Sequence, residues 1–266
     1  MLTRRALLES RETVVSWAPE RPHSRYSGVG IRSLLFVLLL VPLLASCGSS
    51  DDAPTPEAND DSVETILPAA STRIAETQSM RFGLEIEGDT FIDQSNSIQL
   101  VSARGQLARP DSVAVDFQVS LFGAGSVSIR MISIGTKAWT TDLLTGDWSI
   151  APIEFGYNPT VLYDNQNGLG PIMGNIDQAE LTGQENVRGR NAHHISGLAS
   201  QETIALVTSD TMTGSSIRIE LWIDTSTSDL LRVRLAEPPD NGKGSPAVWT
   251  LNLTDHGKQV SIEPPI

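Results

Sequence analysis

From Met80 onward, apolar and polar residues alternate along most of the chain, which is the two-residue period of β-strands with one buried face. Rows of this kind begin near residues 80, 113, 127, 217, 231 and 249. Turn-forming residues such as Gly88-Asp89 and Gly146-Asp147 lie between strand segments. Strands with one apolar and one polar face are typical of antiparallel sheets. The pattern therefore predicts a large antiparallel sheet, arranged as a meander or a barrel.

Three segments replace this alternation with the three-to-four-residue spacing of a helix. The first is 63–79, in which Pro68 predicts a kink or a later helix start. The second is 158–174, which predicts one or two short helices that meet near Gly168, and the third is 200–208. A sheet with a few helices on one face gives an α+β layer arrangement.

A short apolar run precedes the only cysteine of the chain. Residues 33–44 follow Arg32 and are too few for a transmembrane helix, which needs about 20 residues. The sequence Leu-Ala-Ser before Cys47 matches the lipobox of bacterial lipoproteins, in which diacylglycerol is attached to the thiol. We therefore expect residues 1–46 to be a lipoprotein signal peptide and Cys47 to anchor the protein on the extracytoplasmic face of the cell membrane.

The rest of the N-terminal region sets the domain boundaries. Val29 would start a signal peptide of normal length, so we expect it to be the initiator and residues 1–28 to be a gene-start artefact. Residues 47–62 hold the lipidated cysteine and then small, acidic and proline residues, which predict a disordered tether. Residues 63–266 are left as a single domain, a length that suits one large β domain.

The charge of the chain excludes one class of partner. The total is −13, residues 1–47 contribute +3 from six Arg and three acids, and the remainder therefore carries −16. An acidic domain lacks the basic footprint that nucleic-acid binding needs. The lipid anchor, rather than a basic patch, must then hold the protein to the membrane.

No set of residues indicates catalysis or metal binding. His193 and His194 are adjacent, and neighbours on a strand point to opposite faces, so they are poor ligands for one metal ion. The sequence has no Gly-x-Ser-x-Gly nucleophile motif and no phosphate-binding loop. We expect no enzymatic activity, no metal and no cofactor. An extracytoplasmic hydrolase stays an alternative that no residue supports.

The apolar face of the predicted sheet has two interpretations. Helices that fill it incompletely would leave an apolar cavity, and such cavities bind apolar ligands. The same side chains could instead form an ordinary packed core. The alternation alone favours the packed core.

Several stretches resemble the LppX/LprAFG family of lipid-anchored proteins, which share the fold of the lipoprotein carrier LolA. They follow the family's order from Val63 to Pro265, and no single one is specific. The stretches are residues 77–82, 135–139 with 144–148 and their two Trp residues, 158–169, 185–190, 221–224 with 230–232, and 253–264.

The resemblance implies a curved antiparallel half-barrel wrapped over a few short helices and enclosing a lipid-sized apolar cavity. It further implies that the ligand is an acyl lipid or glycolipid carried outside the plasma membrane, with lipid-export machinery as a further partner. Family members have no catalytic residues to transfer, and their ligand contacts are apolar and dispersed. Our candidates for lining the cavity are the apolar residues Phe82, Leu84, Val115, Phe117, Ile129, Met131, Leu162, Leu169, Ile172, Met173, Ile219 and Leu221.

Two hypotheses compete within this fold. In the first, acyl chains are buried against these side chains, and the helical segment 158–174 is a candidate gate, because glycines and Pro171 interrupt it. In the second, the cavity is collapsed and the anchored domain binds a protein partner.

Overall fold

The computed structural model describes residues 61–93, 95–121, 123, 125–151, 159–239 and 244–265. The expected signal peptide and Cys47 lie outside these residues, as do most of the expected tether and Asn158. Within the described ranges, no helix combines the length and the apolar character needed to cross a membrane.

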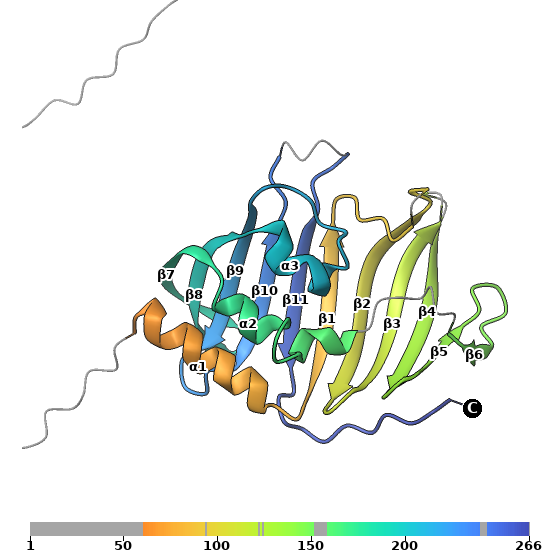
Figure 1. Cartoon of the computed structure of the whole chain (residues 1–266), viewed down its shortest axis with the longest axis horizontal. Coiled ribbons are helices and arrows are strands. Elements are labelled where there is room, and N and C mark those ends of the chain that lie inside the picture. Colours follow the sequence, from red (N-terminus) through yellow and green to blue (C-terminus); the bar gives the residue numbers. More distant parts are fainter. Residues whose placement is uncertain are drawn as a thin grey trace, which may run out of the picture. The chain divides into compact units, whose positions relative to one another are not determined.

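Eleven strands form one sheet in which every neighbouring pair is antiparallel (Figure 1). The strand order is β6-β5-β4-β3-β2-β1-β11-β10-β9-β8-β7. The strands are β1 (Ser79–Glu87), β2 (Ile98–Ala108), β3 (Ser112–Leu121), β4 (Ser126–Ile134), β5 (Lys137–Thr141), β6 (Trp148–Ile150), β7 (Asp177–Val187), β8 (Arg190–Ala199), β9 (Ile217–Asp224), β10 (Leu230–Ala236) and β11 (Val248–Thr254).

The sheet consists of two meanders that meet in its middle. Strands β1 to β6 follow one another as neighbours, as do β7 to β11, and the pairing of β1 with β11 joins the two series. The chain leaves the sheet at one edge, β6, and returns at the opposite edge, β7. The connection between these edges therefore spans the width of the sheet, and it carries two of the short helices.

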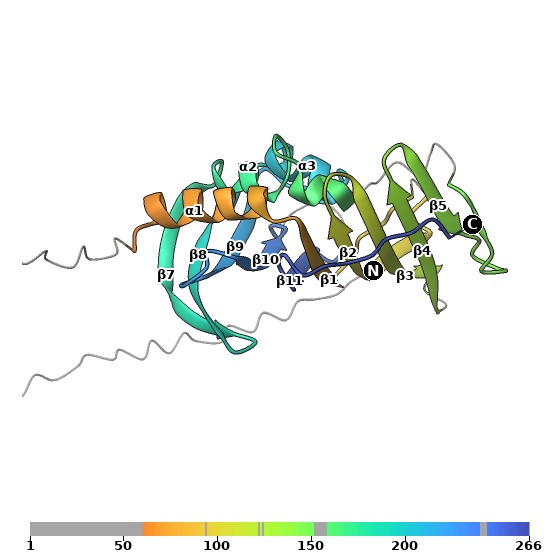
Figure 2. The same cartoon turned by 90° about the horizontal axis from the view of Figure 1, so that it is seen from below.

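Four short helical elements lie on one side of the sheet, and the sheet curls around them (Figure 2). They are α1 (Val63–Glu76), the 3₁₀ helix η1 (Pro159–Tyr163), α2 (Leu169–Met173) and α3 (Gln201–Thr208). This arrangement confirms the expected α+β half-barrel.

The first helix is shorter than its apolar spacing predicts. It ends at Glu76 because Thr77 is an extended C-cap and Ser79 already begins β1. Pro68 lies inside the helix, and the helix starts before it, at Val63, so the proposed later start is wrong. The central segment forms two short helices, as expected, and Ser200 caps α3 by accepting a hydrogen bond from the Thr203 amide.

The hydrophobic core fills the space between α1, α2, α3 and the sheet. The buried face of α1 consists of Ile66, Leu67, Ala70 and Ile74. Gly170 lets α2 approach α1 closely, since a Cβ there would lie 3.2 Å from the Ser71 hydroxyl oxygen. Small residues at such contacts allow two helical backbones to pack tightly.

Ion pairs attach α1 to the sheet. The buried carboxylate of Asp229, in the β9–β10 turn, accepts hydrogen bonds from Arg73 Nε at 2.7 Å and Arg190 Nη2 at 2.8 Å. Burial alone would raise the pKa of Asp229, but the hydrogen bonds from Arg190 and Arg73 outweigh it and hold the pKa below its usual value. The charged form is therefore the one built into the fold.

Arg109, at the turn between β2 and β3, forms hydrogen bonds with the end of α1 and the end of η1. Its Nε donates to the Thr77 carbonyl at 3.0 Å, and its Nη2 donates to the Tyr163 carbonyl at 2.8 Å and the Ile74 carbonyl at 3.3 Å. The guanidinium also lies 4.6 Å from the centre of the Tyr163 ring, whose hydroxyl donates to the Ala108 carbonyl at 2.7 Å. Arg109 thus connects the ends of α1 and η1 to the turn between β2 and β3.

We predict that Arg109→Ala lowers the free energy of unfolding by about 2–3 kcal/mol, because it leaves partly buried carbonyls without donors. Arg104→Ala is the matched control, since this side chain is 78% exposed and lies 3.6 Å from Asp116; we expect a loss of about 0–1 kcal/mol. Urea unfolding of both variants measures the difference. Equal losses would contradict the role given to Arg109.

Candidate functional site

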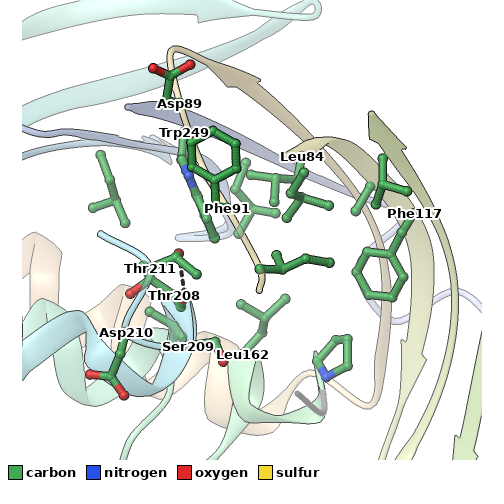
Figure 3. Close-up of a pocket in the computed structure, with 18 of the residues that line it drawn as sticks. Leu84, Asp89, Phe91, Phe117, Leu162, Thr208, Ser209, Asp210, Thr211 and Trp249 are labelled. Carbon is green, nitrogen blue, oxygen red and sulfur yellow. Dashed lines mark hydrogen bonds between the residues drawn. The ribbon is translucent and has the colours of Figure 1, made fainter. Parts of the chain in front are cut away.

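A cavity of about 1000 Å³ lies between the sheet and the helices. Its walls come from β1–β4 in one meander, from β10 and β11 in the other, and from η1, α2 and the end of α3 (Figure 3). Ligand pockets commonly measure about 300–1000 Å³, so this cavity is at the large end of that range.

One cross-strand row forms the floor of the cavity. Its members are paired in register across six adjacent strands, and all of them line the cavity. Side chains at paired positions share a face of the sheet, so the row presents a continuous apolar strip to the interior. This floor row is Val233, Leu251, Leu84, Ala103, Phe117 and Ile129.

A glycine makes room for the aromatic ring beside the floor row. Phe82 lines the cavity, and its register partner on β2 is Gly105. A Cβ at residue 105 would come within 2.8 Å of the Phe82 ring. The absence of a side chain at Gly105 therefore sets where Phe82 can lie.

The helical side of the cavity is also apolar. Pro159 and Leu162 of η1, Leu169 of α2 and Val207 of α3 contribute to it. One hydrogen bond, from Arg109 Nη2 to the Tyr163 carbonyl, ties the end of η1 to the β2–β3 turn. These helical residues therefore cover the floor row from the side opposite the sheet.

Polar residues gather at the mouth of the cavity. Asp89, Asp93 and Asn96 come from the loop between β1 and β2, and residues 208–211 follow from the end of α3. In Figure 3, Asp89 lies above Phe91 and Trp249, and Asp210 lies below Thr211. The apolar Leu84 and Phe117 lie to the right of them. One end of an occupant would thus meet polar groups, while the rest would meet hydrocarbon.

The loop between β1 and β2 is ordered around Asp93. The carboxylate accepts hydrogen bonds from the Ser95 and Ser97 hydroxyls and from the backbone amides of Ser97 and Ile98. The Ser95 bond is the largest of the effects that hold the pKa of Asp93 well below its usual range. A second carboxylate, that of Asp89, ties this loop to the β10–β11 connection by accepting from the Ser245 amide at 2.9 Å.

The structure separates the twelve candidate lining residues into two groups. Six of them line the large cavity, and the other six are packed in the core, where four also border a second space of only about 10 Å³. Lining the cavity are Phe82, Leu84, Phe117, Ile129, Leu162 and Leu169. In the core are Val115, Met131, Ile172, Met173, Ile219 and Leu221.

The sequence does not indicate the other lining residues, for three different reasons. Leu251 and Trp249 were assigned to a strand, and their place beside β1 follows only from the pairing of the first and last strands. Ala103 lies on β2, whose alternation is weak. The loop residues Phe91 and Asp93 belong to no periodic segment, so no signal in the sequence places them at the mouth.

The cavity is suited to burying apolar groups rather than to catalysing a reaction. Among the described residues that line it, the ionisable side chains are Asp89, Asp93 and Asp210, all at the mouth. The interior offers aliphatic and aromatic groups, which bind hydrocarbon by removing it from water.

A model of one protein family covers most of this chain. The family is described as LppX_LprAFG lipoprotein, and its model matches residues 62–262. The chain belongs to the LppX_LprAFG lipoprotein family. The expected resemblance is therefore confirmed, and with it membership of a family whose members a covalent lipid anchors to a membrane.

Known members of the family are distant in sequence but match over nearly their full length. Lipoprotein LprA of Mycobacterium tuberculosis is 22% identical over 245 residues, which cover 86% of this chain and 94% of LprA. The lipoarabinomannan carrier protein LprG of the same species is 21% identical over 241 residues, covering 89% of this chain and 95% of LprG.

Solved structures of two LppX_LprAFG proteins share the fold. The crystal structure of LprF from Mycobacterium bovis matches with a TM-score of 0.61 at 18% identity, over 76% of this chain and 96% of LprF. That of LppX from Mycobacterium tuberculosis matches with a TM-score of 0.53 at 14% identity, over 76% of this chain and 98% of LppX.

We predict that Ala103→Trp, in the middle of the floor row, abolishes uptake of an uncharged apolar dye such as Nile red. The indole would occupy the space that the dye needs. Ala114→Trp is the matched control, because Ala114 has the opposite parity on β3 and its side chain points away from the cavity. Fluorescence titration measures both variants, with circular dichroism to verify folding. Unchanged uptake by a folded Ala103→Trp variant would show that the dye binds elsewhere.

Proposed function

We propose that this LppX_LprAFG lipoprotein binds acylated lipids in its cavity and carries or presents them outside the plasma membrane. The observation that carries the proposal is the cavity of about 1000 Å³ with its continuous apolar floor row. The name of the relative LprG, a lipoarabinomannan carrier, supports a glycolipid as the ligand. The competing hypothesis of a protein-binding module assumed a collapsed cavity, and nothing in the described residues favours it.

The energetics of burial are sufficient for such a ligand. Each methylene removed from water contributes about 0.8 kcal/mol. Association costs roughly 4–15 kcal/mol in lost translational and rotational freedom. A long acyl chain, with more than about ten methylenes buried, reaches this range by itself. The polar mouth would then hold the headgroup near water.

The anchor is the second part of the proposal. Cys47, behind the sequence Leu-Ala-Ser, is the residue that would carry the diacylglycerol, and residues 1–46 would be removed. The tether from Cys47 to the start of α1 would let the domain move over the extracytoplasmic face of the membrane, with a coil dimension on the order of 20 Å. Lipid-export machinery would supply or receive the ligand there.

We expect native mass spectrometry to detect about one acyl lipid per protein when the chain is purified from a lipid-containing host. Cys47→Ser is introduced so that the protein carries no acyl groups of its own. Ala103→Trp, added to the same chain, should remove the bound lipid. A protein that carries no lipid, and takes none up from membranes, would refute lipid binding.

We expect Cys47→Ser to abolish incorporation of a radiolabelled fatty acid and to release the protein from the membrane fraction. The thiol is the group that the anchor requires, so a hydroxyl cannot replace it. Ser46→Ala is the control, since a small residue is kept before the cysteine, and it should still be labelled. Labelled Cys47→Ser protein would place the anchor at another residue.

A further inference from the structure

A second and much smaller apolar space adjoins one end of the cavity. It measures about 10 Å³, against about 1000 Å³ for the cavity, and every described residue that lines it is nonpolar. Four residues border both spaces, so their side chains form the wall between the two. These wall residues are Leu169 of α2, Val207 of α3, and Val233 and Leu235 of β10.

The apolar strip of the floor row continues beyond this wall. Val233, at the β10 end of the floor row, is paired in register with Leu221 on β9, and Leu221 is paired with Ile195 on β8. Paired positions share a face of the sheet. Leu221 borders the second space and is not among the described residues that line the cavity. The second space therefore lies in line with the floor row, on the other side of the wall.

The helix α2 has little room to move away from the wall, because it is backed by α1. A Cβ at Gly170, the residue after Leu169, would lie 3.2 Å from Ser71 Oγ and 3.3 Å from Ile74 Cγ2, both on α1. Leu169 itself is only 4% exposed. Its side chain therefore cannot swing aside by a retreat of α2 from the sheet.

The residues beyond the wall leave no room for a ligand as they are packed. Ile172, Met173, Ile219 and Leu221 border the second space, and none of them is more than 4% exposed. A space of about 10 Å³ is at the lower limit for holding a single water molecule. Close-packed side chains would have to shift before an acyl chain could pass, and protein interiors resist such changes.

We propose that Leu169 and Val207 form a stop that limits the length of the acyl chain that the cavity accepts. A chain that lies along the floor row toward β10 would end at the wall. Further methylenes would leave the hydrocarbon of the membrane without being buried in the protein, and each would lower the affinity about fourfold. The inference rests on the proposed lipid-binding function and narrows its ligand class by chain length.

The test is a competition among lipids that differ only in chain length. The series consists of diacyl glucosylglycerols with two identical chains, from myristoleoyl through palmitoleoyl, oleoyl and eicosenoyl to erucoyl. The full chain with Cys47→Ser is incubated with vesicles that contain equal amounts of all members, and the loaded lipids are counted by mass spectrometry. We expect similar loading up to one length and a fall of at least about tenfold at the next, because the added methylenes find no place.

Truncation of the wall should move this limit to longer chains. We expect Leu169→Ala to raise the loading of the first rejected lipid at least about tenfold relative to the parent. Val207→Ala opens the same wall from α3 and should act in the same direction. Ile172→Ala is the matched control, because Ile172 lies on the same helix and borders the second space but is not among the described residues that line the cavity. It should leave the limit unchanged.

A compensating substitution tests where the longer chain goes. Leu221→Phe, added to Leu169→Ala, fills the second space from the side of the sheet and should restore the limit of the parent. Circular dichroism verifies the folding of each variant. If Leu169→Ala does not fold, Val207→Ala with and without Leu221→Phe carries the same test.

Each outcome bears on a different claim. Loading that does not depend on chain length in the parent would overturn the stop and leave lipid binding intact. An equal shift in Ile172→Ala and Leu169→Ala would overturn the role of the wall, as would an unchanged limit in both wall variants. A longer limit that persists after Leu221→Phe would show that the chain does not enter the second space, which also overturns the inference. Loading of no lipid of any length would refute the proposed function itself.

Discussion

The structure depends on the need to cover one apolar face of a continuous sheet. Strand side chains alternate between two faces, so eleven paired strands collect their apolar residues on one large surface that must be kept from water. The helices available for this are short and few in the described part of the chain. They pack closely over part of the face and leave a space elsewhere, which is the cavity.

Polar contacts add to the apolar packing that holds the helices over the sheet. Arg73 attaches α1 to the buried Asp229, and Arg109 holds the end of α1 and the end of η1 by their carbonyls. Charged hydrogen bonds have preferred lengths and directions, so these contacts orient α1 and η1 relative to the sheet. The cavity also spans the seam between β1 and β11, so both meanders must fold to form it.

Alternation in the sequence predicted the antiparallel sheet with a few helices on one face, whereas the half-barrel and the cavity came from the resemblance to the family. Phe82, Leu84 and Phe117 lie in clearly alternating segments. Their positions in the alternation predict that their side chains point to the apolar face of the sheet. The strand β2 was missed because Ala103 and Gly105 stand where larger apolar residues would mark a strand, and the cavity and the Phe82 ring need that space.

The remaining lining residues depend on tertiary pairing that has no local signature. Val233 and Leu251 join the floor row only because the last strand pairs with the first. The mouth is assembled from a loop and a helix end that are far apart in the chain, such as Asp93 and Asp210. Periodicity indicates which face a residue takes, but not which distant segment lies opposite.

The central claim is that an acyl chain lies along the floor row, and photo-crosslinking tests it most directly. The protein would be loaded with a glycolipid that carries a diazirine near the end of one acyl chain, and the complex would be irradiated. Peptide mass spectrometry would then locate the adducts. The account predicts adducts on cavity residues such as Leu84, Phe117 and Ile129. Adducts confined to the outer face of the sheet, for example around Trp222, would contradict it.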